Sequence, residues 1–298
     1  MKRAPVGLLL ACLAGTAAGA RPAHAYVRYY TEVGAPFFWA RATLPLTAYV
    51  HDFDQGSMTA DQVTGAITRA AATWSAAQND CTYLTLAPVT SNEAAPRAAN
   101  DAHNSLIFRN DSWCELAPDG TCEMDYDASA LAFTWDTANK TTGQIYDADI
   151  EVNLFDFQWA DVVADPARGN AMDLQNALTH EMGHFIGLDH TCYSPLSPNT
   201  TTPPIDSTGT PVPDCSAAPP DVQETTMYPS AMPGDTQKRS LAADDLAGLC
   251  GIYPIDHPPP ADGLLRGGCA LGDGCPAPVH LALVSGAIVW VRSRRRRA

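Results

Sequence analysis

The clearest hydrophobic pattern in the chain has a helical period and lies within residues 58–77. Apolar residues recur there at Val63, Ile67, Ala71 and Trp74. Residues three to four apart lie on one face of a helix, and Thr59, just before them, is a good N-cap. The pattern therefore predicts an amphipathic helix over residues 58–77.

Shorter apolar or alternating runs flank this helix, bounded by Asp, Asn and Gly, as is typical of strands. The predicted strands are residues 46–53, 81–89, 104–110, 129–135 and 144–154. A second helix follows over residues 174–186, with Asp173 as its N-cap. This order of elements indicates a mixed α/β (α+β) layer fold.

The chain changes character after the second helix. Residues 193–220 contain eight prolines, too many for a helix or a central strand, so a long loop is expected. Residues 240–253 then predict a last helix, capped by Ser240 and ended by Gly251. Proline and glycine dominate from there, so we place the domain end near Ile255, a linker over 256–278 and a tail over 279–298.

The N-terminus is typical of a secretory signal. Two basic residues precede an apolar run, and Ala23-His24-Ala25 is a cleavage site of the A-x-A kind. Residues 1–25 are then a signal peptide, and the mature domain spans 26–255. The alternative is a lipoprotein attachment site at Cys12, although the apolar run before that cysteine is short.

Export implies oxidised cysteines. Without Cys12, eight of the nine remain. Six belong to the predicted domain, and six allow 15 pairings, so the sequence alone leaves the connectivity open. Cys114 with Cys122 and Cys192 with Cys215 close the shortest loops, which would leave Cys81 for Cys250.

The charge of the predicted mature region limits its partners. All 33 acidic residues but only 10 basic ones lie within residues 26–278, a formal net charge of −23. Such a surface argues against nucleic acid or an anionic membrane as a partner.

Residues 179–191, THEMGHFIGLDHT, carry the candidate chemistry. His180 and His184 are four apart and share one helix face, so both can bind one zinc ion. Gly187 can take a positive φ and turn the chain back, so that His190 becomes the third ligand. Glu181 is the expected general base, which takes a proton from a zinc-activated water during peptide hydrolysis.

The spacing H-E-x-x-H-x-x-G-x-x-H resembles the signature of metzincin zinc peptidases, which also have a methionine turn beneath the metal. Met227 in TTMYPS matches that turn. The tripeptide Met227-Tyr228-Pro229 is similar to the turn sequence of bacterial matrixin-like proteins of the M10 type. This resemblance implies that the tyrosine after the methionine is not a metal ligand, so Tyr228 is not expected to bind zinc. Tyr228 and Pro229 would line the S1′ pocket.

The resemblance covers residues 46–253 and implies a twisted, mostly parallel sheet with long helices and an edge strand that pairs with an extended peptide. The likeness has departures: Thr191 replaces the usual serine, 36 residues separate His190 from Met227, and Ser230-Ala231 replace P-x-Y after the turn. Phe133 stands where a second, structural zinc would need histidine, so one zinc is expected. The enzyme is also expected to be a monomer. No cysteine switch for latency is present.

Other polar residues have weaker signals. Asp147, Asp149 and Glu151 alternate along one predicted strand and are hard oxygen donors that suit calcium, as are Asp125 and Asp127 nearby, but solvated carboxylates explain them equally well. Three more histidines lack metal-ligand spacing and are expected to be structural or at the surface: His51, His103 and His257.

Two functions are consistent with these features. The first is a secreted zinc endopeptidase that acts on proteins or peptides. The alternative is a catalytically idle zinc-binding surface or adhesion module of the same fold. Retention of Glu181 with all three histidines favours the enzyme.

The C-terminus has its own pattern. Residues 279–291 are largely apolar but shorter than the roughly 20 residues that span a bilayer, and five arginines follow. The order of glycine-cysteine motif, apolar stretch and arginine cluster resembles sorting tails of some Gram-negative bacterial surface proteins. A sorting tail processed within residues 267–275 is expected, with a plain membrane anchor as the alternative.

Overall fold

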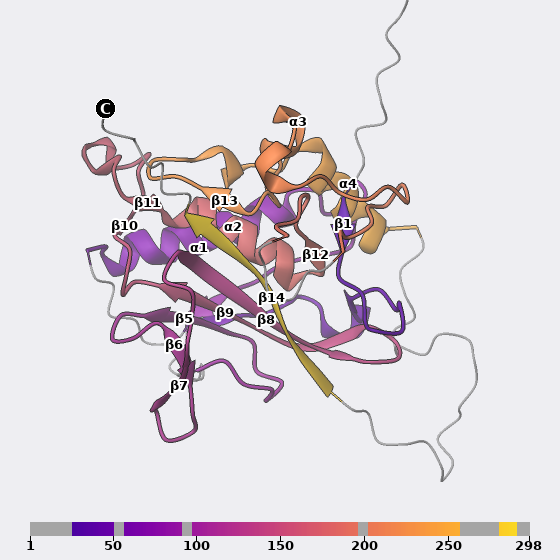
Figure 1. The fold of residues 1–298 in the computed structure, drawn as a ribbon, viewed down its shortest axis with the longest axis horizontal. Coiled ribbons are helices and arrows are strands. Elements are labelled where there is room, and N and C mark those ends of the chain that lie inside the picture. Colours follow the sequence, from indigo (N-terminus) through magenta and orange to yellow (C-terminus); the bar gives the residue numbers. More distant parts are fainter. Residues whose placement is uncertain (1–25, 51–56, 91–96, 196–201, 257–279, 291–298) are drawn as a thin grey trace, which may run out of the picture.

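The computed structural model describes residues 26–50, 57–90, 97–195, 202–256 and 280–290. A twisted sheet forms one layer, and the two long helices α1 and α2 pack together behind it (Figure 1). The α-helices are α1 (Ala60–Ser75), α2 (Leu174–Phe185), α3 (Pro220–Gln223) and α4 (Ala243–Ile252). The mixed α/β class predicted from the sequence is confirmed.

The main sheet has the strand order β13-β14-β8-β9-β5-β3-β4, and β2 also pairs with β9. Strand β8 is antiparallel to both β9 and β14, whereas the other pairs are parallel. The strands are β2 (Phe38–Trp39), β3 (Tyr49–Val50), β4 (Val89–Thr90), β5 (Ser105–Arg109), β8 (Ala130–Asn139), β9 (Gln144–Asn153), β13 (Ser230–Ala231) and β14 (His280–Trp290).

Three two-stranded pairs lie outside this sheet. They join β1 (Val27–Arg28) to β12 (Leu188–Asp189), β6 (Cys114–Leu116) to β7 (Cys122–Asp125), and β10 (Trp159–Ala160) to β11 (Met172–Asp173). Short 3-10 turns complete the elements: η1 (Arg41–Thr43), η2 (Pro166–Arg168), η3 (Cys215–Ala217) and η4 (Gln237–Arg239).

Helix α1 forms where the apolar period predicted it. Thr59 accepts a hydrogen bond from the Gln62 amide, and the Gln62 side chain accepts one from the Thr59 amide, which completes a capping box. The predicted apolar face is buried, and Trp74 at its end is fully enclosed. The Trp74 Nε1 donates to the Thr179 carbonyl over 2.7 Å, so α1 fixes the position of α2.

The predicted strands differ in how far they form. Residues 104–110, 129–135 and 144–154 become β5, β8 and β9. Of residues 46–53, only Tyr49 and Val50 form a strand, and 51–53 lie outside the described residues. The prediction of a full strand over 81–89 was wrong: the segment forms only isolated bridges, at Thr82 and Leu86, before β4 begins at Val89.

The limits of the last helix were also predicted wrongly. Helix α4 begins at Ala243, and the Asp245 carboxylate accepts the Ala242 amide, so Ser240 is not its cap. Gly251 lies inside the helix, which ends at Ile252. A Cβ at Gly251 would overlap the Tyr26 ring, so this glycine permits close packing and does not end the helix.

Three disulfides join Cys81 to Cys250, Cys114 to Cys122 and Cys192 to Cys215. This is the pairing that the short-loop argument favoured. It indicates an oxidising, extracellular type of environment. The Cys192–Cys215 bridge closes the long loop that follows the third histidine, while Cys12, Cys269 and Cys275 lie outside the described residues.

Residues from beyond the predicted domain end join the sheet. The eleven residues of β14 pair with β8 and β13. Within the described part of the chain, no helix is long and apolar enough to cross a membrane. The signal peptide at residues 1–25 and most of the linker at 256–278 lie outside the described residues. The roles of these segments, and of the tail as an anchor or sorting signal, stay predictions.

Candidate metal centre and active site

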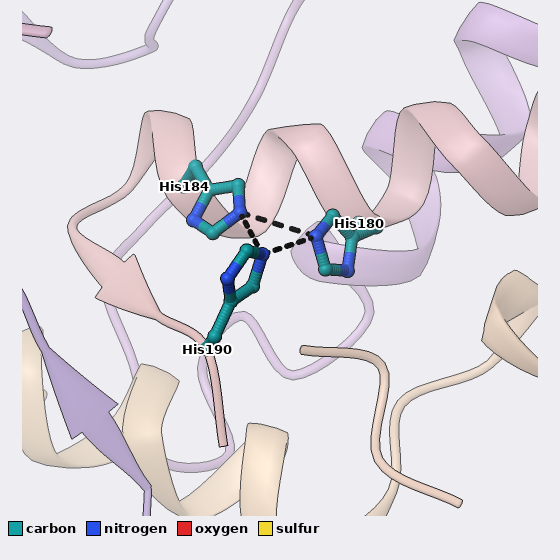
Figure 2. Close-up of side chains that lie close together, drawn as sticks. All are labelled: His180, His184 and His190. Carbon is teal, nitrogen blue, oxygen red and sulfur yellow. Dashed lines mark hydrogen bonds between the residues drawn. The ribbon is translucent and has the colours of Figure 1, made fainter. Parts of the chain in front are cut away.

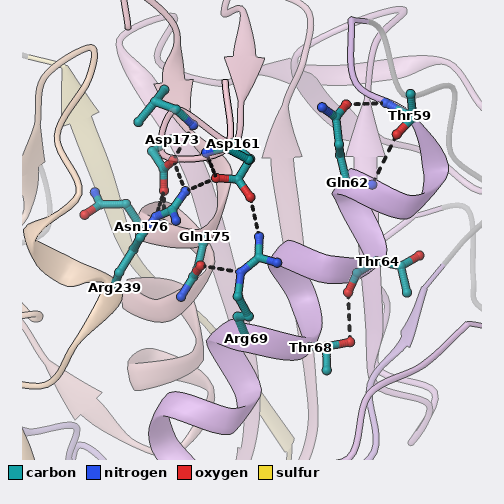
Figure 3. Close-up of polar contacts among 12 residues, drawn as sticks. Thr59, Gln62, Thr64, Thr68, Arg69, Asp161, Asp173, Gln175, Asn176 and Arg239 are labelled. Carbon is teal, nitrogen blue, oxygen red and sulfur yellow. Dashed lines mark hydrogen bonds and ion pairs between the residues drawn. The ribbon is translucent and has the colours of Figure 1, made fainter. Parts of the chain in front are cut away.

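Helix α2 carries two of the histidines, and charged residues hold its first turn. The Asp173 side chain accepts the Asn176 amide, as the N-cap prediction required. Arg239 bridges Asp173 and Asp161, and Arg69 from α1 reaches the other oxygen of Asp161 (Figure 3). Burial opposes ionisation of Asp161, but the hydrogen bond and charge of Arg239 outweigh it and lower its pKa.

The three histidine rings converge on one point (Figure 2). The Nε2 atoms of His180, His184 and His190 lie 3.1–3.2 Å from one another. Gly187, with φ of +93°, turns the chain after α2 and so brings His190 back. A Cβ at Gly187 would lie 3.0 Å from the Phe37 carbonyl oxygen, so the turn also needs glycine for space.

Backbone carbonyls fix the orientation of the two helical imidazoles. The Nδ1 of His180 lies 2.6 Å from the Thr226 carbonyl, and the Nδ1 of His184 lies 2.8 Å from the Leu188 carbonyl. A carbonyl can only accept, so both Nδ1 atoms carry the proton and both Nε2 lone pairs point to the centre. The Tyr29 hydroxyl also lies 3.1 Å from the Nδ1 of His184.

The site keeps these imidazoles neutral. Burial lowers the pKa of His184 to about 4. Burial, with the neighbouring histidines, also lowers the pKa of His180 and His190 well below the usual value. Neutral imidazole is the form that binds a metal, so the centre is ready for one at neutral pH.

The predicted methionine turn lies directly beneath α2. Met227 is buried against Gly183, where a Cβ would overlap the methionine sulfur. The Asp245 carboxylate accepts the amides of Thr226 and Met227, over 2.8 and 3.1 Å. These contacts hold the Thr226 carbonyl in place under His180.

Lys238 supports the same turn from below. It is fully buried, and its Nζ donates to the carbonyls of Thr226 and Tyr228. Burial lowers the pKa of Lys238 to about 7, against the opposing charges of acidic groups nearby. Sequence reasoning missed both Asp245 and Lys238 because neither lies in a recognisable motif.

Glu181 is completely buried beside His180, and β8 holds its carboxylate. The Thr134 hydroxyl donates to Oε2 of Glu181 over 2.7 Å. The sequence predicted the strand that contains Thr134 but could not show which of its side chains would face the helix. Thr134 is therefore a site residue that only the tertiary structure reveals.

The expected pocket residues follow the turn. The Tyr228 hydroxyl donates to the Cys215 carbonyl over 3.3 Å, in the disulfide-closed loop, and Pro229 leads into β13. Thr191 keeps its hydroxyl 2.8 Å from that of Thr225. Phe133 lies in an aromatic cluster, with its ring stacked on Trp113 at 5.4 Å.

The candidate calcium ligands are buried side chains of strand β9. Asp149 accepts the amides of Ala99 and Ser105 over 2.9 and 2.7 Å, and Glu151 pairs with Arg109 and accepts from Tyr126. Burial raises the pKa of Asp149 to about 8 and that of Asp147 to about 6.

Protein groups thus occupy the oxygens of two of these three carboxylates. In the described part of the chain, only the three histidines bring three metal-ligating atoms close together. Asp127 accepts hydrogen bonds from the amide and hydroxyl of Ser129, and Asp125 is an exposed residue at the end of β7. His103 stacks on Tyr49, and His51 and His257 lie outside the described residues. Calcium binding by Asp147, Asp149 and Glu151 stays a prediction.

Comparison of the chain with models of known protein families finds no match, and a search of curated protein sequences finds none. The arrangement of side chains therefore carries the functional argument. It provides a three-histidine cluster that could hold a metal ion, with a buried glutamate beside it.

Proposed function

We propose that this protein is a zinc-dependent endopeptidase related to the matrixin-like metzincins, exported as a monomer and acting on proteins or peptides. One observation carries the proposal: three imidazoles converge from a helix and the turn after it, and the residue next to the first of them, Glu181, is fully buried with its carboxylate held by Thr134. The methionine turn beneath α2 supports the same assignment.

The donor set fits zinc. Three nitrogens about 2.0–2.1 Å from a tetrahedral ion would lie about 3.3 Å apart. The observed separations of 3.1–3.2 Å between Nε2 atoms are close to that value. Three protein ligands leave the fourth position for water or substrate, as in catalytic zinc sites.

When bound, zinc supplies a Lewis acid that polarises a peptide carbonyl and lowers the pKa of a water molecule. The chain's own residues do the rest. Glu181 is adjacent to a ligand without being one, so its carboxylate can take the proton from the attacking water and deliver it to the leaving amine. Thr134 keeps that carboxylate in one orientation through its 2.7 Å hydrogen bond.

The test compares the wild-type chain with Glu181→Ala, measuring zinc per chain by mass spectrometry and cleavage of unfolded casein. Glu123→Ala, on exposed strand β7, is the matched control. We expect all three proteins to hold one zinc and only Glu181→Ala to lose nearly all cleavage. Because β14 covers one edge of β8, the assay is repeated with β14 displaced by substitution. Zinc binding without cleavage in both forms would favour the idle adhesion module. More than a tenth of wild-type turnover in Glu181→Ala would refute the general-base role.

A further inference from the structure

Strand β14 occupies the side of β8 that would otherwise be an edge of the sheet. It runs antiparallel to β8, with His280 opposite Asn139 and Val284 opposite Trp135. An unpaired strand edge presents a row of amides and carbonyls that can pair with any extended peptide. In this chain, the C-terminal segment satisfies that row.

The same strand passes beside the candidate catalytic residues. Ser285 pairs with Thr134, whose side chain holds Glu181. Farther along, Val289 and Trp290 pair in parallel with β13, which begins three residues after Met227. Figure 1 shows β14 running along β8 toward β13 in front of α2, and α2 and β14 lie in contact.

From these contacts we infer that the chain's own β14 is an intramolecular inhibitor, which occupies the edge of β8 and the adjacent β13 where an extended peptide substrate would pair. The inference rests on the proposed peptidase function. A peptide held between an antiparallel and a parallel neighbour is bound mainly through its backbone, which favours extended, unfolded substrates of varied sequence. A substrate must displace β14 to reach Glu181.

Two features favour an inhibitory role over that of a substrate. Because β14 belongs to the same chain, its binding is intramolecular and competes at a high effective concentration. The ladder with β8 is also irregular between Ser285 and Ala287 and again between Ala287 and Val289. Such bulges redirect backbone groups, so the peptide bonds beside Thr134 are not presented as those of a regular strand.

The test uses the mature full chain, with its C-terminus verified by intact mass. Successive amides of a strand point to opposite sides, so one of the two amides of Leu283 and Val284 faces β8. Replacing both residues with proline removes that amide, whichever of the two it is. The matched control carries proline at Ala270 and Leu271, outside the strand. Two quantities are measured: cleavage of labelled unfolded casein, and hydrogen exchange of the β8 amides.

We expect the β14 variant to cleave casein at least about tenfold faster than the wild type and the control, with faster exchange in β8. Equal β8 exchange in all three proteins would overturn the docking of β14. Faster exchange with equal, measurable cleavage would overturn the exclusion of substrate but leave the peptidase function intact. No cleavage by the variant, with zinc bound and β8 exposed, would refute the peptidase function itself.

If the proline pair prevents folding, a specific protease site within residues 257–279 allows the chain to fold first and be cut afterwards. The cut chain is then compared with the uncut chain by the same two measurements. Release of the tail with a tenfold gain in cleavage supports the inference, and unchanged cleavage after release contradicts it.

Discussion

Replacing Gly183 with alanine tests how closely the methionine turn approaches helix α2, which carries two of the three histidines. Gly183 lies in the middle of α2, where alanine normally stabilises a helix by about 1 kcal/mol over glycine. Here the added Cβ would overlap the Met227 sulfur and lie 2.9 Å from Trp74. Both neighbours are buried, Trp74 is held by its bond to Thr179, and Asp245 holds the turn backbone.

Overpacking of this kind costs roughly 1–3 kcal/mol, which exceeds the gain in helix propensity. We expect Gly183→Ala to lower the free energy of unfolding by about 1–2 kcal/mol and to weaken zinc binding. Gly65→Ala is the matched control, because Gly65 lies mid-helix in α1 and its Cβ would meet only the half-exposed guanidinium end of Arg69, at 3.0 Å, which is ion-paired with Asp161 but not enclosed. That variant should be up to about 1 kcal/mol more stable than the wild type.

Urea unfolding with the disulfides intact measures both variants, and zinc retention is followed in the presence of a competing chelator. The free energies of unfolding of the two variants should differ by about 1–3 kcal/mol, with Gly183→Ala below the wild type and Gly65→Ala at or above it. If Gly183→Ala is as stable as Gly65→Ala and holds zinc as tightly as the wild type, the close packing of the turn against α2 is wrong.

Three further predictions concern the ligands and their supports. His190→Ala should abolish cleavage and lose zinc to a weak chelator, because two protein ligands remain; one tightly bound zinc in that variant would refute the three-histidine site. Thr134→Val should lower kcat roughly tenfold and change the pH profile of kcat while zinc is retained, and Thr134→Ser should restore both. Asp245→Ala leaves three amides without their acceptor and should lower the free energy of unfolding by about 2–4 kcal/mol, measured by urea titration.

Local patterns in the sequence determined most helices and strands of this protein and the residues of its candidate metal site. The apolar period of α1 and the caps Thr59 and Asp173 were readable because a helix repeats over a few neighbouring residues. The three histidines of the candidate metal site were readable for the same reason: all lie within eleven residues, on helix α2 and the turn that Gly187 makes after it. The argument from short loop lengths also favoured the disulfide pairing that the structure has.

Contacts between distant residues were decided only by the tertiary structure. Thr134 lies 47 residues from Glu181, and Asp245 lies 18 from Met227, so no local period or spacing relates them. The pairing of β14 with β8 was not readable from the local sequence either. The apolar run of this segment suggested a membrane segment or a sorting tail. An apolar run indicates only that a segment is stabilised by burial of its side chains. A strand also needs the unpaired amides and carbonyls of a neighbouring strand. Which strand edge offers them depends on how the whole chain folds.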